Sequence, residues 1–260
     1  MRIVSLAPSN TEILFALGVG EQVVGVTAFC DYPQEVKTLP KVGGWTTANS
    51  HKILALKPDL VITSTFLQQE APQRFRNYPF KLLHVDPKDL NSVFESFLTI
   101  GKAVKRQHQA RTLVKKMHQE LKKPTRTTPS PTSHNLNREP RIYIEEWHQP
   151  PMVSGNWVPE LVVLASADYF PIKPSQPSRA VTDEEINAFN PEIILLSLCG
   201  FGKRPTADIV TKRKAWKSIY AVKNNRVYVV DDSYFNRPGP RLIKGLEQLG
   251  DIIHLYHTRQ

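Results

Sequence analysis

The stretch Ile53-Leu-Ala-Leu-Lys-Pro-Asp-Leu-Val-Ile-Thr-Ser64 decides the fold, because its pattern recurs at Ile186-Asn-Ala-Phe-Asn-Pro-Glu-Ile-Ile-Leu-Leu-Ser197. In each copy an amphipathic run stops at a proline, which disfavours helical geometry at the residue before it. A short apolar segment follows, which is typical of a buried strand. Each copy therefore predicts a helix, a tight stop and a strand.

Similar strands flank both copies. Strand-like segments lie upstream at 2–6 and 141–145, and downstream at 81–86 and 226–231. Three landmarks in the same order favour two similar α/β lobes, each with a central sheet. A chain of 260 residues can supply two such cores. The alternative is one doubly wound sheet without duplication.

A long amphipathic segment lies between the two sets of landmarks. Apolar residues recur three or four apart from residue 92 to residue 122, which predicts a single long helix joining the lobes. The next residues are rich in Pro, Thr and Ser and nearly lack apolar side chains, which favours a flexible loop. The expected domains are an N-terminal α/β lobe (1–91), an interlobe helix (92–123), a flexible loop (124–138) and a C-terminal α/β lobe (139–260).

Three sequence patterns predict where helices begin. Ser9-x-x-Glu12, Ser92-x-x-Glu95 and Thr182-x-x-Glu185 each fit a capping box, in which two side chains satisfy free backbone N–H groups. Gly18 fits the left-handed residue that ends a helix.

Composition restricts the compartment and the chemistry. Two cysteines, Cys30 and Cys199, are too few for a disulfide framework, so we expect free thiols. The chain opens with Met1-Arg2 directly on a predicted strand, which leaves no room for a secretory signal. That predicts a cytoplasmic protein, or a periplasmic or extracytoplasmic one if the true start lies upstream. No apolar run reaches the length of a membrane span.

The net charge of +10 is unevenly distributed. Nine basic residues lie between residues 102 and 126, with no aromatic side chains among them to stack on bases. A solvated helix face is the simpler interpretation, so we expect no nucleic-acid partner, although a weak attraction to anionic surfaces follows. We also expect a monomer.

Aromatic side chains gather in the turns after the predicted strands, where open α/β sheets bind their ligands. Several such rings at facing loop tips suggest a flat, largely apolar ligand held in a cleft between the lobes. The candidates from these turns are Phe29, Asp31, Tyr32, Trp45, Trp147, Asn156, Ser233, Tyr234, Phe235, Asn236 and Arg237.

Catalytic motifs are missing. The chain lacks a nucleophile elbow, a phosphate-binding Gly-rich loop and a zinc-peptidase helix, and its eight histidines show no ligand spacing. The interpretation is a binding protein with no catalytic residue, no metal site and no catalytic cofactor. The alternative is an enzyme that reuses the two-lobed fold, with Cys30 or Ser154 in the cleft.

These motifs together resemble the helical-backbone class of ABC-transporter substrate-binding proteins, which serve vitamin B12, siderophores and haem. The similarity is greatest to the vitamin B12-binding members and spans nearly the whole chain. The motifs that carry it are Ser9-x-Thr11-Glu12, Asp31-Tyr32-Pro33, Gly44-Trp45, Leu56-Lys57-Pro58-Asp59, Ser154-Gly155-Asn156, and Tyr234-Phe235 followed by Pro240-Arg241.

The resemblance implies roles for several of these residues. Phe29 matches an aromatic that lies against the corrin, Trp45 matches a cleft tryptophan, and 233–237 match a second corrin-contacting loop. Ser64 stands where the family has another cleft tryptophan. The implied function is non-catalytic binding of a corrinoid ligand, as the substrate-binding component of an ABC importer or as an intracellular carrier.

The resemblance also implies a partner and leaves a second ligand class open. The family docks on its permease through one surface acid on each lobe; Glu70 matches the first, and Asp208 is the nearest candidate for the second. Haem or a ferric siderophore is the alternative ligand. For these, Tyr32, Tyr234, Arg237 and His148 offer ligands or charge partners.

Overall fold

The computed structural model describes residues 1–123 and 138–258, which form two compact units. The first unit comprises residues 1–118 and 238–240, and the second comprises 119–237 with the chain from 241 onward. The loop predicted over 124–138 lies outside the described residues, except for Arg138.

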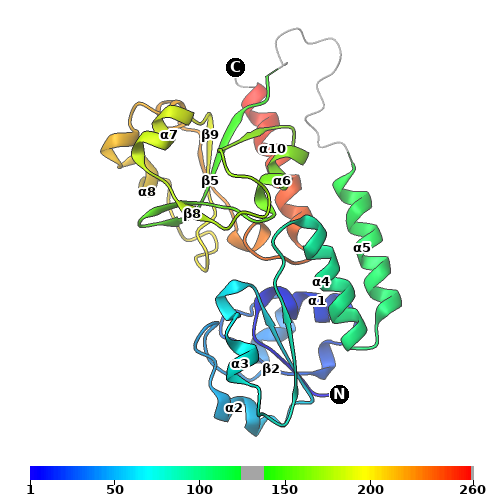
Figure 1. The fold of residues 1–260 in the computed structure, drawn as a ribbon. Coiled ribbons are helices and arrows are strands. Elements are labelled where there is room, and N and C mark those ends of the chain that lie inside the picture. The colour runs from blue at the N-terminus through cyan, green and yellow to red at the C-terminus, as the bar shows by residue number, and fades with distance from the viewer. Residues whose placement is uncertain (124–137, 259–260) are drawn as a thin grey trace. The chain divides into compact units, whose positions relative to one another are not determined.

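The first unit is an α/β layer structure around a four-stranded parallel sheet of order β2-β1-β3-β4. Figure 1 shows its strands and helices in blue to green. The elements are β1 Ile3–Ser5, α1 Pro8–Ala16, β2 Val23–Val26, α2 Ser50–Ala55, β3 Leu60–Ser64, α3 Ala71–Arg74, β4 Lys81–Val85, α4 Leu90–Ala103 and α5 Gln107–Leu121, with short 3₁₀ turns at Gly20–Gln22, Gln34–Thr38 and Phe66–Gln68.

The second unit has its own sheet, of order β10-β9-β5-β6-β8, and β7 also pairs with β5. Its elements are β5 Arg141–His148, β6 Pro151–Val153, α6 Val158–Leu164, β7 Asp168–Tyr169, β8 Arg179–Ala180, α7 Asp183–Phe189, β9 Ile193–Leu196, α8 Asp208–Thr211, α9 Tyr220–Lys223, β10 Val227–Val229 and α10 Leu242–Thr258, with 3₁₀ turns at Lys214–Trp216 and Asp232–Tyr234.

The two sheets share one topology. The parallel strands β7-β5-β9-β10 of the second unit repeat the order β2-β1-β3-β4 of the first, and every pairing in both sets is parallel. The prediction of two similar α/β lobes is therefore confirmed, and the alternative of one continuous sheet is wrong. The second unit adds an antiparallel hairpin, because the end of β5 pairs with β6.

The duplicated sequence stretch forms the same local structure twice. In α2–β3, Lys57 has φ of 44°, and in α7–β9, Asn190 has φ of 47°. Each left-handed residue directly precedes the proline, so the helix ends there and the chain enters the buried strand. Strands β3 and β9 are buried along their whole length, as expected when helices cover both faces of a parallel sheet.

The single interlobe helix predicted over 92–123 is wrong. The segment forms two helices, α4 and α5, which lie side by side in Figure 1. The break falls at Lys105, whose φ of 56° is left-handed. A Cβ at Gly101 would lie 2.4 Å from Cβ of Ala110. The absent side chain at Gly101 therefore lets α5 fold back against α4, a tertiary contact that an unbroken apolar period does not reveal.

Two of the predicted capping boxes are also wrong. Helix α1 begins at Pro8 with Ala7 as its uncapped N-terminal residue, so Ser9 lies inside the helix. Helix α4 begins earlier than expected, and its box pairs Asp89 with Ser92. The box of Thr182 with Glu185 is confirmed, and Gly18 is left-handed as predicted, with φ of 73°.

None of the helices within the described ranges is both long and apolar enough to cross a bilayer.

The Gly101 contact gives a stability prediction. In Gly101→Val the new side chain must overlap Ala110, and overpacking of this kind costs about 1–3 kcal/mol. We expect a lower urea midpoint with an unchanged slope, measured by circular dichroism. Lys102→Val introduces the same β-branched residue at the next, exposed position and should change the free energy of unfolding by less than about 0.5 kcal/mol. Equal losses in both variants would show that α4 and α5 do not depend on this contact.

Candidate functional site

A turn anchored by a buried thiol follows β2 in the first unit. Cys30 is buried, with Sγ 3.2 Å from Oγ1 of Thr11 and 3.3 Å from Oγ1 of Thr27. Burial raises its pKa, so it stays a neutral thiol. Its neighbours lie on the outside: Phe29 is 45% exposed and Tyr32 is 43% exposed. The turn therefore presents two aromatic rings to solvent at the carboxyl end of a strand.

The loop that carries Trp45 lies beside this turn. The backbone N–H of Ala28 donates to the carbonyl of Gly43, and the Phe29 ring lies beside Gly44. Gly43 has φ of 131°, and a Cβ there would lie 2.6 Å from the Thr47 carbonyl, so only glycine fits. The structure thus brings Phe29 and the Trp45 loop together, although they are sixteen residues apart in sequence.

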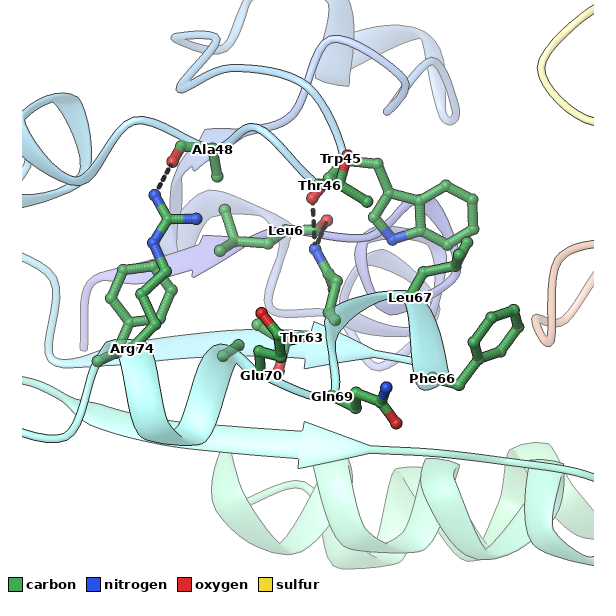
Figure 2. A pocket seen from close by; sticks show the side chains of 13 residues that line it. Leu6, Trp45, Thr46, Ala48, Thr63, Phe66, Leu67, Gln69, Glu70 and Arg74 are labelled. Atoms are coloured by element: carbon green, nitrogen blue, oxygen red, sulfur yellow. Dashed lines mark hydrogen bonds between the residues drawn. The ribbon is translucent and has the colours of Figure 1, made fainter.

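Trp45 lines a pocket of about 280 Å³ within the first unit (Figure 2). The side-chain amide of Gln68 ties the walls together: Nε2 donates to the carbonyls of Leu6 and Trp45, and Oε1 accepts from the Ser64 N–H. Arg74 donates to the carbonyl of Ala48 at 2.6 Å. Within the described residues, the buried indole N–H of Trp45 finds no acceptor, which leaves a donor for a bound molecule.

The turn after β3 adds residues that the site prediction omitted. Phe66 is 52% exposed and Leu67 is 43% exposed, and both line the same pocket. Thr65 precedes them with a left-handed φ of 64°, which turns the chain away from the strand. The sequence signal was an apolar pair directly after a buried strand. Ser64, by contrast, is fully buried.

An aromatic cluster forms at the corresponding edge of the second unit. The ring centroids of Trp147 and Phe201 are 6.1 Å apart, and His148 lies 5.7 Å from Trp147 and 6.0 Å from Phe201. Trp147 is 39% exposed, and its indole N–H donates to the carbonyl of Gln149. Phe201 was not among the predicted site residues, because it lies between Gly200 and Gly202 in a loop that gives no periodic signal.

An ion pair between Arg213 and the buried Glu145 holds the strand that carries this cluster. The guanidinium of Arg213 donates to both carboxylate oxygens of Glu145, at 2.6 and 2.7 Å, and to the carbonyl of His148. Burial raises the pKa of Glu145, while the Arg213 contacts oppose that shift. Arg213 also lies over the ring of Trp216. The pair therefore fixes the strand end from which Trp147 projects.

The loop 233–237 divides into core and surface residues. Phe235 is fully buried and its carbonyl accepts from the Trp157 indole, and Ser233 is buried with its hydroxyl bonded to Asp231. The sequence predicted that these two side chains contact a ligand; both lie in the core, and ligand contact there stays a prediction. The amide of Asn236 both donates to and accepts from Ser197. Sequence alternation could not separate these roles, because the loop has neither helical nor strand period.

Tyr234 and Arg237 remain partly exposed. The cations of Arg241 and Lys244 lie over the Tyr234 ring, at 5.6 and 5.8 Å from its centroid. A Cβ atom at Gly245 would lie only 2.4 Å from the carbonyl oxygen of Tyr234, so the glycine allows this loop to pack closely on α10. The phenol ring of Tyr234 is therefore a partly exposed aromatic surface with positive charge beside it.

Three ionisable groups of the second unit, Glu146, Asp232 and Cys199, influence one another electrostatically. Burial raises the pKa of Glu146, which accepts from the Ser178 hydroxyl at 2.6 Å, and the charge of Asp232 raises it further. Asp232 accepts from the N–H groups of Gly200 and Gly202. Burial and these two carboxylates raise the pKa of Cys199 to about 12, against the opposing charge of Arg237.

The remaining predicted positions lie on loops. Asn156 is left-handed, with φ of 55°, and its backbone N–H donates to Gln176. Asp31 and Glu70 are exposed. Asp208 is exposed and pairs with Lys212 at 2.8 Å. Within the described ranges, no three His, Cys, Asp or Glu side chains gather closely enough to hold a metal ion.

Comparison with known proteins shows the same architecture. The periplasmic binding protein family matches residues 3–234. An ABC transporter substrate-binding lipoprotein of Bacillus subtilis is 34% identical over 97% of this chain and 80% of its own length. A vitamin B12-binding protein of Pectobacterium carotovorum is 28% identical over 95% of this chain and 86% of its own. A periplasmic haem-binding protein from Pseudomonas aeruginosa superposes with a TM-score of 0.84 at 19% identity, over 98% of this chain and 92% of that one.

These comparisons give no support to the predicted cytoplasmic location, since the Bacillus subtilis relative is named as a lipoprotein and the family and the Pseudomonas aeruginosa protein are named as periplasmic. The family match spans both units and nearly the whole sheet architecture described above. The chain therefore belongs to the periplasmic binding protein family and is a solute-binding protein of an ABC importer.

Proposed function

We propose that this protein binds a corrinoid of the vitamin B12 type, without transforming it, and delivers it to an ABC permease from outside the cytoplasm. The carrying observation is that exposed aromatic rings stand at the carboxyl ends of the strands in each unit: Phe29, Tyr32 and Phe66 in the first, and Trp147 in the second. Exposing an aromatic ring to water is unfavourable, and a flat apolar ligand that covers the rings would remove that unfavourable exposure.

The polar groups around these rings suit the rim of a corrin, which carries amide side chains. The Trp45 indole N–H is an unused donor in the described part of the chain. The partly exposed Tyr234 ring, with the cations of Arg241 and Lys244 over it, adds an aromatic surface beside positive charge. A preformed set of rings and a few directed polar groups is the usual composition of a small-molecule site.

Permease docking is proposed through Glu70 and Asp208. Both carboxylates are exposed and stand on short helical segments, Glu70 directly before α3 and Asp208 in α8. An exposed acid can meet a permease arginine without desolvating a buried group first. The weak i,i+4 pair of Asp208 with Lys212 would exchange for such a contact at little cost.

Cyanocobalamin titration tests the ligand. We expect binding that quenches tryptophan fluorescence, with Phe29→Ala and Tyr32→Ala each weakening the Kd about tenfold, because each removes an apolar ring worth about 1.5 kcal/mol of burial. Leu98→Ala removes a comparably exposed apolar side chain on α4 and should leave the Kd unchanged. Absence of binding at tens of micromolar, with a folded protein, contradicts the proposal.

Haem is the second candidate, and one observation favours it. Nδ1 of His148 is buried and has no hydrogen-bond partner within the described residues, beside the rings of Trp147 and Phe201. An imidazole nitrogen of a histidine can ligate haem iron. Titration with hemin should shift the Soret band and lose that shift in His148→Ala if haem is the ligand. If hemin causes no Soret shift in a protein that still binds cobalamin, haem is excluded as the ligand.

Thiol chemistry tests the non-catalytic part of the proposal. Alkylation requires the thiolate, and a pKa of about 12 at Cys199 leaves little of it at neutral pH. We expect iodoacetamide to label Cys199 roughly a thousandfold more slowly at pH 8 than a free cysteine of ordinary pKa. The raised pKa of Cys30 predicts slow labelling there too. The urea-unfolded chain, as control, should label both rapidly. Fast labelling of either thiol in the folded protein would favour an enzyme.

A further inference from the structure

The positive charge of the chain is concentrated in one short segment. Residues 102–123 contain eight Lys or Arg residues and one acid, Glu120, so this segment supplies +7 of the net +10. Most of that charge belongs to helix α5 and its ends. The remaining 238 residues together contribute only +3.

Helix α5 separates its apolar and basic side chains. Ala110, Met117 and Leu121 are buried, and the first of these packs against Gly101 of α4. Arg111, Lys115 and Lys116 are exposed. At 100° per residue these three positions lie on the side of the helix away from Ala110 and Met117. We call Arg111, Lys115 and Lys116 the basic face of α5.

Little neutralises this basic face. Glu120, the acid of the segment, is already paired with Lys123 at 2.6 Å. Within the described residues, no carboxylate lies at ion-pair distance from Arg111, Lys115 or Lys116. Arg111, Lys115 and Lys116 lie within six consecutive residues of α5, which corresponds to a rise of about 8 Å along the helix axis.

We propose that the basic face of α5 binds the anionic headgroups of a phospholipid bilayer. A straight helix can bring several cations to a flat surface at once, and each Lys or Arg near an anionic bilayer contributes attraction that adds along the face. The Bacillus subtilis relative is named as a lipoprotein, so a protein of this family can work at a membrane surface. The inference does not depend on which ligand the protein carries.

Nucleic acid is a weaker explanation for the same charges. Proteins that track nucleic-acid strands combine basic residues with aromatic rings on which bases stack. Helix α5 contains no Phe, Tyr or Trp. A surface of anionic headgroups requires only exposed positive charge, which the basic face of α5 supplies.

Vesicle sedimentation tests the proposal. The full chain is mixed with phosphatidylglycerol-containing vesicles, with phosphatidylcholine vesicles and with duplex DNA. We expect binding to the first only, and its loss at about 1 M salt, where the Debye length falls to about 3 Å. The triple variant Arg111→Gln, Lys115→Gln, Lys116→Gln should reduce the partition coefficient on the order of 100-fold.

A matched variant separates the basic face from total charge. Lys52→Gln, Lys81→Gln, Lys173→Gln removes three exposed lysines elsewhere and leaves the same net charge of +7. It should retain nearly all vesicle binding, and circular dichroism should show both variants folded. The proposal is overturned if the wild-type chain ignores anionic vesicles, if both variants lose binding equally, or if DNA competes the chain off the vesicles.

Discussion

The whole structure depends on one packing constraint, which operates twice: a helix must stop abruptly so that the chain can enter a strand buried on both faces. Lys57 before Pro58 and Asn190 before Pro191 meet it with left-handed backbone. Strands β3 and β9, which follow, pair in parallel with β1 and β5 in matching order. Parallel pairing places the loops after neighbouring strands at one edge. Trp147 at the end of β5 and Phe201 after β9 are therefore neighbours because of backbone register, not sequence proximity.

This dependence explains how far the sequence could predict the protein. Buried strands have a strong apolar signal, so β3 and β9 were predicted nearly to the residue. The break between α4 and α5 escaped prediction because apolar periodicity continues across it, while Gly101 and Lys105 act through a tertiary contact and one backbone angle. The capping residues of α1 and α4 were predicted wrongly because these helices begin a few residues earlier than expected, at Pro8 and directly after Asp89.

The candidate site was partly predictable for a related physical reason. Phe29, Tyr32 and Trp147 were identified because an aromatic in a turn is unusual, and all three are exposed. Phe235 and Ser233 have the same sequence context but lie in the core, since Trp157 and Asp231 occupy their polar groups. Whether a loop residue faces inward or outward is decided by partners distant in sequence. The same limitation hid Phe66 and Phe201, which the fold places with the predicted rings.

The electrostatics agree with the proposal that this protein binds its ligand without transforming it. Burial keeps both cysteines as neutral thiols, and Arg213 holds Glu145 in a closed ion pair, so these groups hold structure. The exposed groups are aromatic rings, and the buried Trp45 indole N–H has no acceptor within the described residues. Rings and a directed donor of this kind can lower the free energy of a bound molecule.

Hydrogen exchange with and without cyanocobalamin is the sharpest test of corrinoid binding, because it measures the protection of each loop separately in the intact protein. Binding at the proposed loops should slow amide exchange in the segments around Phe29 to Tyr32, Trp45, Trp147 and Tyr234, and should leave α2 and α7 unchanged. Protection confined to the amino ends of the strands, or spread evenly over the chain, would contradict it.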